Sequence, residues 1–302
     1  MLHISLAAEP IAHIGSFPVT NSLLLTWIVM AILIILALMV KKNLSIVPNK
    51  LQSIFEILIE GLYSFFESVV GHQVKMMFPL IASLFLFILV ANWIGLVPGV
   101  GTIGYNETVA AEHEAVETQQ VGAEVNTLPS VHQEVSQEIQ TATLHDVSPQ
   151  ESLETQGTNH ISEETTPVTH QTKFVPLFRG PTADLNMTIA LALIAVFAMQ
   201  YFGFKTLGLH YAGRFLNVKN PIMFFVGLLE VVSDASKIIS FAFRLFGNIF
   251  AGEVLLAVMA FLMPFIAPMP FLMLELFVGF IQALVFSTLT AVFINVALAH
   301  EE

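Results

Sequence analysis

Residues 221–263 read PIMFFVGLLEVVSDASKIISFAFRLFGNIFAGEVLLAVMAFLM, an apolar stretch with scattered charges and no proline after Pro221. As one α-helix it would run roughly 65 Å, about twice the hydrocarbon core of a bilayer. The stretch therefore predicts either a hidden turn or a single long and strongly tilted helix. The three prolines of 264–270 suit a hairpin that leads into a last helix at 271–299, which also exceeds an upright span.

Uncharged apolar runs recur along the chain, and each has about the 18–20 residues that a helix needs to cross a bilayer. They are Leu23–Val40, Met76–Pro98, Leu185–Phe204, Val254–Leu274 and Leu276–Ala299. The composition agrees, because only 11% of the residues are charged, whereas soluble domains average about 25%. The sequence predicts an all-α integral membrane protein of about five to six membrane helices, the last two forming a tilted hairpin.

The net charge of −12 belongs to one segment. Residues 105–172 hold 12 acidic residues and no Lys or Arg, whereas the rest of the chain holds 11 of each sign. This segment shows no sustained period of 2 or 3.6 residues, which predicts a disordered insert. We expect 1–104 to form two spans and an amphipathic helix, and 173–302 to form a channel-forming membrane domain. The absence of cysteine excludes disulfides and thiolate metal sites.

Basic residues in the short loops predict the orientation, because such loops lie on the cytoplasmic side. They follow the first span and the span at 185–204, and are Lys41, Lys42, Lys50, Lys205, Arg214 and Lys219. Both loops are therefore expected in the cytoplasm. By parity, the N-terminus and residues 105–172 are expected outside, and the C-terminus in the cytoplasm.

Residues 51–69 have the pattern of an amphipathic helix. The apolar stripe consists of Leu51, Ile54, Phe55, Leu58, Leu62, Phe65, Phe66 and Val69, and the opposite side carries Glu56, Glu60 and Glu67. Such a helix either lies in the membrane interface or packs beside a bundle. We favour a connector that rests on the membrane over a specific docking surface.

Polar residues of the long stretch gather on one side of the predicted helix. At 100° per residue a stripe about 80° wide holds the following residues: Glu230, Ser233, Lys237, Ser240, Arg244 and Asn248. A lone arginine cannot face lipid at low cost, so this stripe faces a partner or a water-filled path. Glu253 lies about 180° round from Arg244 and therefore addresses a different neighbour.

The last helix carries Glu275 and Gln282 seven residues apart, hence on one face. An antiparallel hairpin would place Arg244 level with Gln282 and Glu253 level with Glu275. Carboxylic acids held away from water can exchange protons near neutral pH, so the two glutamates form a candidate proton relay. Arginine keeps its proton and acts as a fixed charge that attracts a passing carboxylate. The alternative is a buried ion pair of Arg244 with Glu253, Glu275 or Glu230.

The stretch Phe243–Glu253, FRLFGNIFAGE, resembles the signature of subunit a of F-type ATP synthases. Pro181–Asn186 is similar to the start of that family's third span, and Gln282 matches its last-helix glutamine. Asn92, Gly95, Leu96, Pro98 and Gly99 resemble the end of its second span. The resemblance covers roughly 20–104 and 174–300, and does not extend to the acidic segment.

The resemblance implies a stator channel beside a rotating ring of c subunits in a bacterial inner membrane. Arg244 would face the ring carboxylate and block a proton short circuit. The outer half-channel would contain Glu253, Glu275, Asn248 and Gln282, and the inner one Lys237, Ser240 and Glu230. Two acids at 253 and 275 depart from the His/Glu pairing of some members. The implied partners are the c ring, the b subunit of the peripheral stalk, other ATP synthase subunits and the lipid bilayer, with no nucleic acid, cofactor or metal.

The chain contains no Gly-x-x-x-x-Gly-Lys-[Ser/Thr] phosphate loop, so we expect no enzyme activity in this chain by itself. Two other functions remain open from the sequence. One is a self-contained ion channel or secondary transporter that uses the same intramembrane charges. The other is a membrane anchor for the acidic segment 105–172.

Overall fold

The computed structural model describes residues 8–42, 49–109, 171–208, 211, 221–264 and 266–298. The chain divides into two units, one made of Met1–Tyr105 and Phe174–Glu302, the other of Asn106–Lys173. The predicted disorder of 105–172 falls almost entirely on 110–170, which lie outside the described residues.

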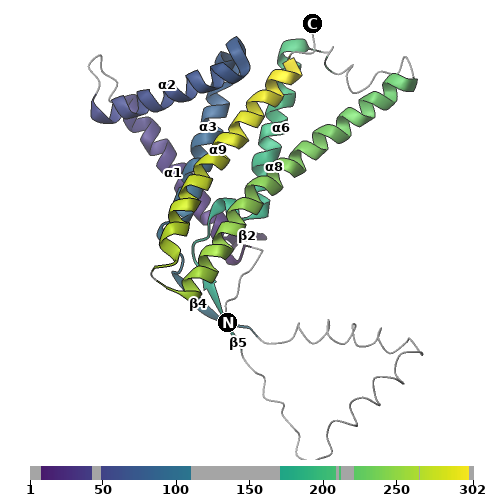
Figure 1. Cartoon of the computed structure of the whole chain (residues 1–302). Coiled ribbons are helices and arrows are strands. Elements are labelled where there is room, and N and C mark those ends of the chain that lie inside the picture. Colours follow the sequence, from purple (N-terminus) through teal and green to yellow (C-terminus); the bar gives the residue numbers. More distant parts are fainter. Residues whose placement is uncertain are drawn as a thin grey trace, which may run out of the picture. The chain divides into compact units, whose positions relative to one another are not determined.

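The first unit is built from long helices (Figure 1). They are α1 (Asn21–Lys42), α2 (Lys50–Val70), α3 (Val74–Gly95), α6 (Leu185–Leu207), α8 (Pro221–Leu262) and α9 (Pro268–Leu298), with the short 3-10 helices η1 (Gly71–Gln73) and η2 (Pro181–Ala183). Five helical stretches of the described residues are long and apolar enough to cross a membrane, α2 and α3 counting together as one. The predicted helical membrane fold is confirmed.

Short strands accompany the helices. They are β1 (Pro10–Ile14), β2 (Phe17–Thr20), β3 (Pro98–Gly101), β4 (Gly104–Val109) and β5 (Gln171–Pro176). The first two pair antiparallel, and β4 pairs with β5. The sequence pattern does not predict these strands, because segments of 4–6 residues are too short to show a clear period.

The long stretch at 221–263 is one continuous helix of 42 residues without a hidden turn. The hairpin predicted at 264–270 is present, since α8 ends at Leu262 and α9 begins at Pro268. The apolar run Val254–Leu274 is therefore not one span, which corrects the division made from hydropathy. It contains the end of α8, the turn and the first residues of α9, because Pro264 and Pro268 cannot continue a helix.

Helix α9 lies at the centre of the bundle and packs against α3, α6 and α8. Its buried side alternates small and large residues, such as Ala283 beside Phe286 and Ala291 beside Ile294. The first third of α8 diverges from this bundle in Figure 1. Its apolar side chains are exposed on every side, up to 77% at Ile222, so this part of α8 needs lipid or another protein around it.

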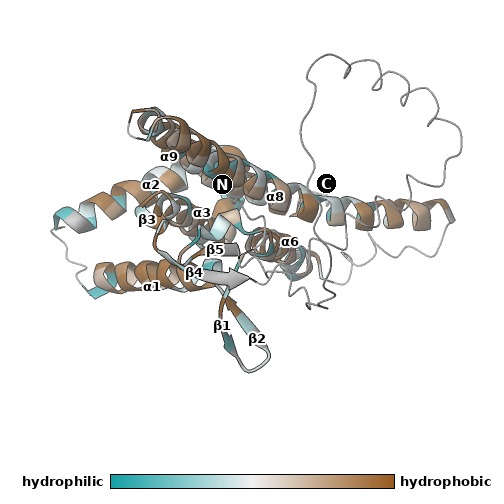
Figure 2. Cartoon of the chain, turned by 90° about the horizontal axis from the view of Figure 1, so that it is seen from below, coloured by the Kyte–Doolittle hydropathy of each residue, from teal (hydrophilic) through white to brown (hydrophobic). Residues whose placement is uncertain are grey.

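Residues 51–69 form the predicted helix, and only part of its apolar stripe is covered by this chain. Leu62 and Phe66 are buried against the bundle, whereas Ile54 is 62% exposed. Figure 2 shows apolar residues along both α1 and α2. The exposed end of the stripe agrees with a helix that borders lipid, and its place in the interface stays a prediction.

A single carboxylate joins the start of α1 to the start of α6. The Asp184 side chain caps α6 by accepting a hydrogen bond from the backbone N–H of Asn186 at 3.0 Å. It also accepts one from the hydroxyl of Ser22 on α1. The adjacent Asn21 donates its side-chain N–H to the carbonyl oxygen of Pro176 at 3.1 Å. These bonds hold α1 against the segment that leads into α6.

We expect Asp184→Ala to lower the free energy of unfolding by about 2 kcal/mol, because the cap is lost and the buried Ser22 hydroxyl loses its acceptor. Thermal unfolding of the purified chain in detergent measures this change. Asp184→Asn is the matched control, since it keeps one side-chain oxygen for the cap and should unfold closer to the wild type. An unchanged unfolding temperature for Asp184→Ala would contradict this assignment.

Candidate functional site

The middle of α8 has one buried and one exposed face. The buried face consists of Phe241, Ala242, Leu245, Phe246, Ile249 and Gly252. The exposed face carries Ser240, Phe243, Arg244, Gly247 and Asn248. The polar stripe expected from the sequence therefore lies largely on the side of α8 that the described part of this chain leaves open.

Arg244 is exposed and makes no salt bridge within the described residues. Of the three candidate ion-pair partners, Glu253 instead faces Arg179, and Glu275 is buried against α8 elsewhere. Glu230 lies about 21 Å before Arg244 along the axis of the same helix, too far for an ion pair. The ion-pair alternative is thus not what the structure shows. The guanidinium is presented outward from a membrane-crossing helix.

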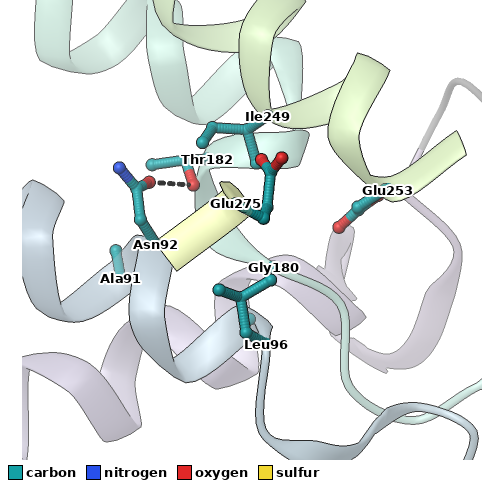
Figure 3. A pocket seen from close by; sticks show the side chains of 9 residues that line it. Ala91, Asn92, Leu96, Gly180, Thr182, Ile249, Glu253 and Glu275 are labelled. Carbon is teal, nitrogen blue, oxygen red and sulfur yellow. Dashed lines mark hydrogen bonds between the residues drawn. The ribbon is translucent and has the colours of Figure 1, made fainter. Parts of the chain in front are cut away.

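A cavity of about 20 Å³, enough for one water molecule, lies between α8 and α9 in the half of the hairpin nearer its loop. Figure 3 shows the side chains that line it. Four parts of the chain line it: the end of α3, the segment around η2, α8 and α9. The lining residues are Ala91, Asn92, Gly95, Leu96, Gly180, Thr182, Ile249, Glu253 and Glu275. Both glutamates expected on the outer side therefore reach one cavity.

Glu275 is the more enclosed of the two acids, at 6% exposed. A Cβ atom at Gly252 would overlap its carboxyl group, so only glycine leaves room for this side chain against α8. Its Oε1 atom is buried and has no hydrogen-bond partner. A buried oxygen without a partner marks a place where water or a proton donor is needed.

Glu253 lies at the rim, with its side chain 35% exposed and Oε2 4.0 Å from Nε of Arg179. A Cβ at Gly180 would lie 3.0 Å from the Glu253 Oε1 atom, so the backbone of this loop closely approaches the carboxyl group. Arg179 was not among the residues expected from the sequence. Its position in the sequence could have indicated it, because Arg179 is the only basic residue between Lys173 and Lys205 and comes just before the Pro181–Asn186 motif.

Asn92 and Thr182 fix the wall of the cavity, although the sequence marked them only as parts of motifs. The Thr182 hydroxyl donates to the Asn92 side-chain oxygen at 2.7 Å (Figure 3). Asn92 in turn donates its side-chain N–H to the carbonyl oxygen of Gly279 at 2.9 Å. A Cβ at Gly279 would lie 3.0 Å from that of Asn92, so glycine permits this close contact of α3 with α9.

Asn248 and Gln282 are brought together by the packing of α8 on α9. The Asn248 side-chain N–H donates to Oε1 of Gln282 at 2.8 Å, and the buried Nε2 of Gln282 has no partner. Gln282 thus meets Asn248, one turn beyond Arg244, which corrects the expected level of Arg244 with Gln282. Glu275 lies against Gly252, next to Glu253, so the other expected level is close to what the structure shows. The close contact at Gly252, which helix spacing does not reveal, sets the height of the two helices.

The residues expected on the inner side lie along α8 and do not form one cluster. Lys237 donates to Asp234 at 2.6 Å, Ser240 is exposed, and Glu230 is half-buried. The described residues contain no group of three His, Asp or Glu side chains that could hold a metal ion.

Residues 23–295 match the protein family described as ATP synthase A chain. The chain belongs to this family. It is 28% identical to the ATP synthase subunit a of Syntrophobacter fumaroxidans, over 99% of this chain and 92% of that protein. It is 30% identical to the subunit a of Geotalea uraniireducens over 97% and 90%, and 29% identical to that of Geotalea daltonii over 89% and 84%.

The family predicted from Phe243–Glu253 is thereby confirmed. The ATP synthase A chain is a multi-pass, non-catalytic membrane subunit of ATP synthase, in agreement with the long apolar helices of this structure. Its matched range includes Arg244, the cavity glutamates and the Asn248–Gln282 pair.

We expect Gly252→Ala to displace the Glu275 carboxyl group and to destabilise the folded chain by about 1–3 kcal/mol, the usual cost of an extra methyl group in a packed interior. Thermal unfolding in detergent measures the loss. Gly61→Ala on α2 is the matched control, because a Cβ there has nothing within 4 Å. Equal unfolding temperatures for the two variants would disprove the close contact.

Proposed function

We propose that the chain carries protons between the two sides of the membrane through two half-channels that meet a rotating c ring, and so couples the ion gradient to ATP synthesis. The observation that carries this proposal is that the arginine and the two glutamates lie in separate parts of the chain. Arg244 is exposed on the open face of α8, whereas the two glutamates reach an internal cavity nearer the loop end of the hairpin.

The exposed arginine favours a partner outside this chain. A guanidinium in the hydrocarbon region needs a counter-charge or water, and none of the described carboxylates forms a salt bridge with it. A carboxylate carried on a neighbouring ring would meet this need each time it passes. Because arginine keeps its proton, it can attract that carboxylate but cannot pass a proton straight across.

The outer half-channel contains Glu253, Glu275, Asn248 and Gln282. Glu253 is at the rim and Glu275 is inside. On α9, Glu275 and Gln282 share one face about 10 Å apart, and each has a buried polar atom without a partner. That separation is too long for direct proton transfer, so water molecules would connect the two side chains.

The inner half-channel follows the same stripe of α8 in the other direction. Ser240 lies one turn before Arg244, and Lys237 and Glu230 follow towards the start of α8. The b subunit and other ATP synthase subunits are the further proposed partners, with the bilayer around the exposed apolar helices. The proposed setting is a bacterial inner membrane, with the N-terminus and 105–172 outside and the C-terminus in the cytoplasm.

A self-contained channel or secondary transporter is the second candidate. It would need the charged path to lie inside the chain, whereas Arg244 and Ser240 are exposed on the surface of the described residues. Proton flux measured on vesicles that contain the purified chain alone separates the two functions. We expect no flux without the c ring.

Arg244→Ala is expected to abolish ATP-driven proton pumping by the reconstituted ATP synthase, because the ring carboxylate would lose its fixed counter-charge. Quenching of a pH-sensitive dye in vesicles measures pumping. Ser233→Ala, also exposed on α8, is the matched control and should pump. Undiminished pumping by Arg244→Ala would refute the proposed function.

Replacing both cavity acids, Glu253→Gln with Glu275→Gln, is expected to slow passive proton conduction about 100-fold, the scale of a lost acid–base group. Assembly should persist, because glutamine matches the size of glutamate. Conduction is measured in vesicles stripped of the nucleotide-binding sector. Glu60→Gln, exposed on α2, is the control. Unchanged flux in the double variant would show that the two acids are only structural.

A further inference from the structure

A second buried polar network lies where α8 leaves the bundle, and the proposed path does not use all of it. Asp234 is 7% exposed and accepts hydrogen bonds from Gln200 Nε2 at 2.7 Å and from Lys237 Nζ at 2.6 Å. The Tyr211 hydroxyl donates to the other side-chain atom of Gln200, Oε1, at 2.8 Å. The network joins α6, α8 and Tyr211, which lies four residues after the end of α6.

Lys237 is turned inward by these contacts. Its Nζ atom lies 5.1 Å from the centre of the Phe293 ring on α9, and its side chain is 19% exposed. The neighbouring residues of the stripe, Ser233 and Ser240, are exposed. The lysine therefore belongs to the stripe by spacing, but its charge is directed back into the chain and met by a carboxylate.

Lys237 and Arg244 are the two basic residues of α8, seven residues and about 10 Å apart on the same side of the helix. The two side chains differ in exposure and in pairing. Arg244 is exposed without a salt bridge, whereas Lys237 is paired with Asp234. If both charges were uncompensated, a passing carboxylate would find two attractive positions on α8 instead of one.

We propose that Asp234 is a positioning residue that neutralises Lys237, so that α8 presents Arg244 as its single uncompensated cation to the ring. This inference rests on the proposed function, in which the open face of α8 meets ring carboxylates. Gln200 and Tyr211 hold the Asp234 carboxylate in place through α6. The pair is buried enough to be screened weakly by salt, so its neutralisation persists at physiological ionic strength.

The test compares passive proton conduction of the ring-assembled membrane sector for Asp234→Asn, Lys237→Gln and the double variant. Asp234→Asn is expected to conduct about tenfold more slowly than wild type, within the range found for coupled charges in one network. Lys237→Gln should also be slower, because it leaves a buried carboxylate unpaired. The double variant should conduct faster than Asp234→Asn, because it removes the uncompensated cation, but more slowly than wild type, since Lys237 also belongs to the proposed inner half-channel. A double variant as slow as Asp234→Asn would overturn the inference.

A second variant avoids the buried network in case Asp234→Asn fails to assemble. Ser240→Lys adds an uncompensated cation one turn from Arg244 at an exposed position, and should slow conduction to a similar degree. Ser240→Met, of similar length without charge, is the matched control. Equal conduction by these two variants would refute the role assigned to charge.

The amount of subunit that assembles with the c ring distinguishes charge from packing. Ser240→Lys should assemble with the ring as well as Ser240→Met does. Slow conduction together with reduced assembly of Ser240→Lys would overturn the inference in favour of a packing defect. Proton pumping by the Arg244→Ala variant of the ATP synthase is measured in parallel. If this variant still pumps, the proposed function itself fails. If it does not pump, a negative result with the Asp234 variants counts only against the role given to Asp234.

Discussion

The close approach of α8 and α9 at Gly252 is the contact on which the arrangement of the polar groups depends. The absence of a side chain at this position lets the Glu275 carboxyl group lie directly against α8. That contact sets the height of one helix relative to the other, and with it the pairing of Asn248 with Gln282. A second close contact of this kind joins α3 to α9, where the absence of a side chain at Gly279 leaves room for Asn92. Two glycines thus place the amide and carboxyl groups of three helices around one small cavity.

Charge compensation divides α8 into three regions. Near the loop end of the hairpin, Glu253 faces the buried Arg179. Nearer its start, Lys237 is paired with Asp234. Between them Arg244 forms no salt bridge with any described residue. Burying an unpaired charge is costly, so a charge that the fold leaves open in a membrane-crossing helix is best understood as one that meets a group on another protein.

The helix content and the hairpin could be predicted from the sequence, because each depends on hydrophobic length and on prolines within one segment. The sequence left open whether 221–263 hides a turn, and the structure shows one undivided helix. The polar stripe through Arg244 could also be predicted, since it follows from helical periodicity alone. The division of Val254–Leu274 was wrong because hydropathy does not see a short turn between two apolar helices. The same limit applies to the short strands, which carry too few residues for a pattern.

The sequence by itself determined the membrane-spanning class, the approximate positions of most helices, the polar stripe through Arg244 and the family to which the chain belongs. Only the tertiary structure decided which polar groups are partners: Arg179 with Glu253, Asp234 with Lys237 and Gln200, and Asn248 with Gln282. The physical reason is that periodicity reports the face of a residue within its own helix. The partner across an interface depends on close approach at particular glycines, between residues as far apart in sequence as Asn92 and Gly279.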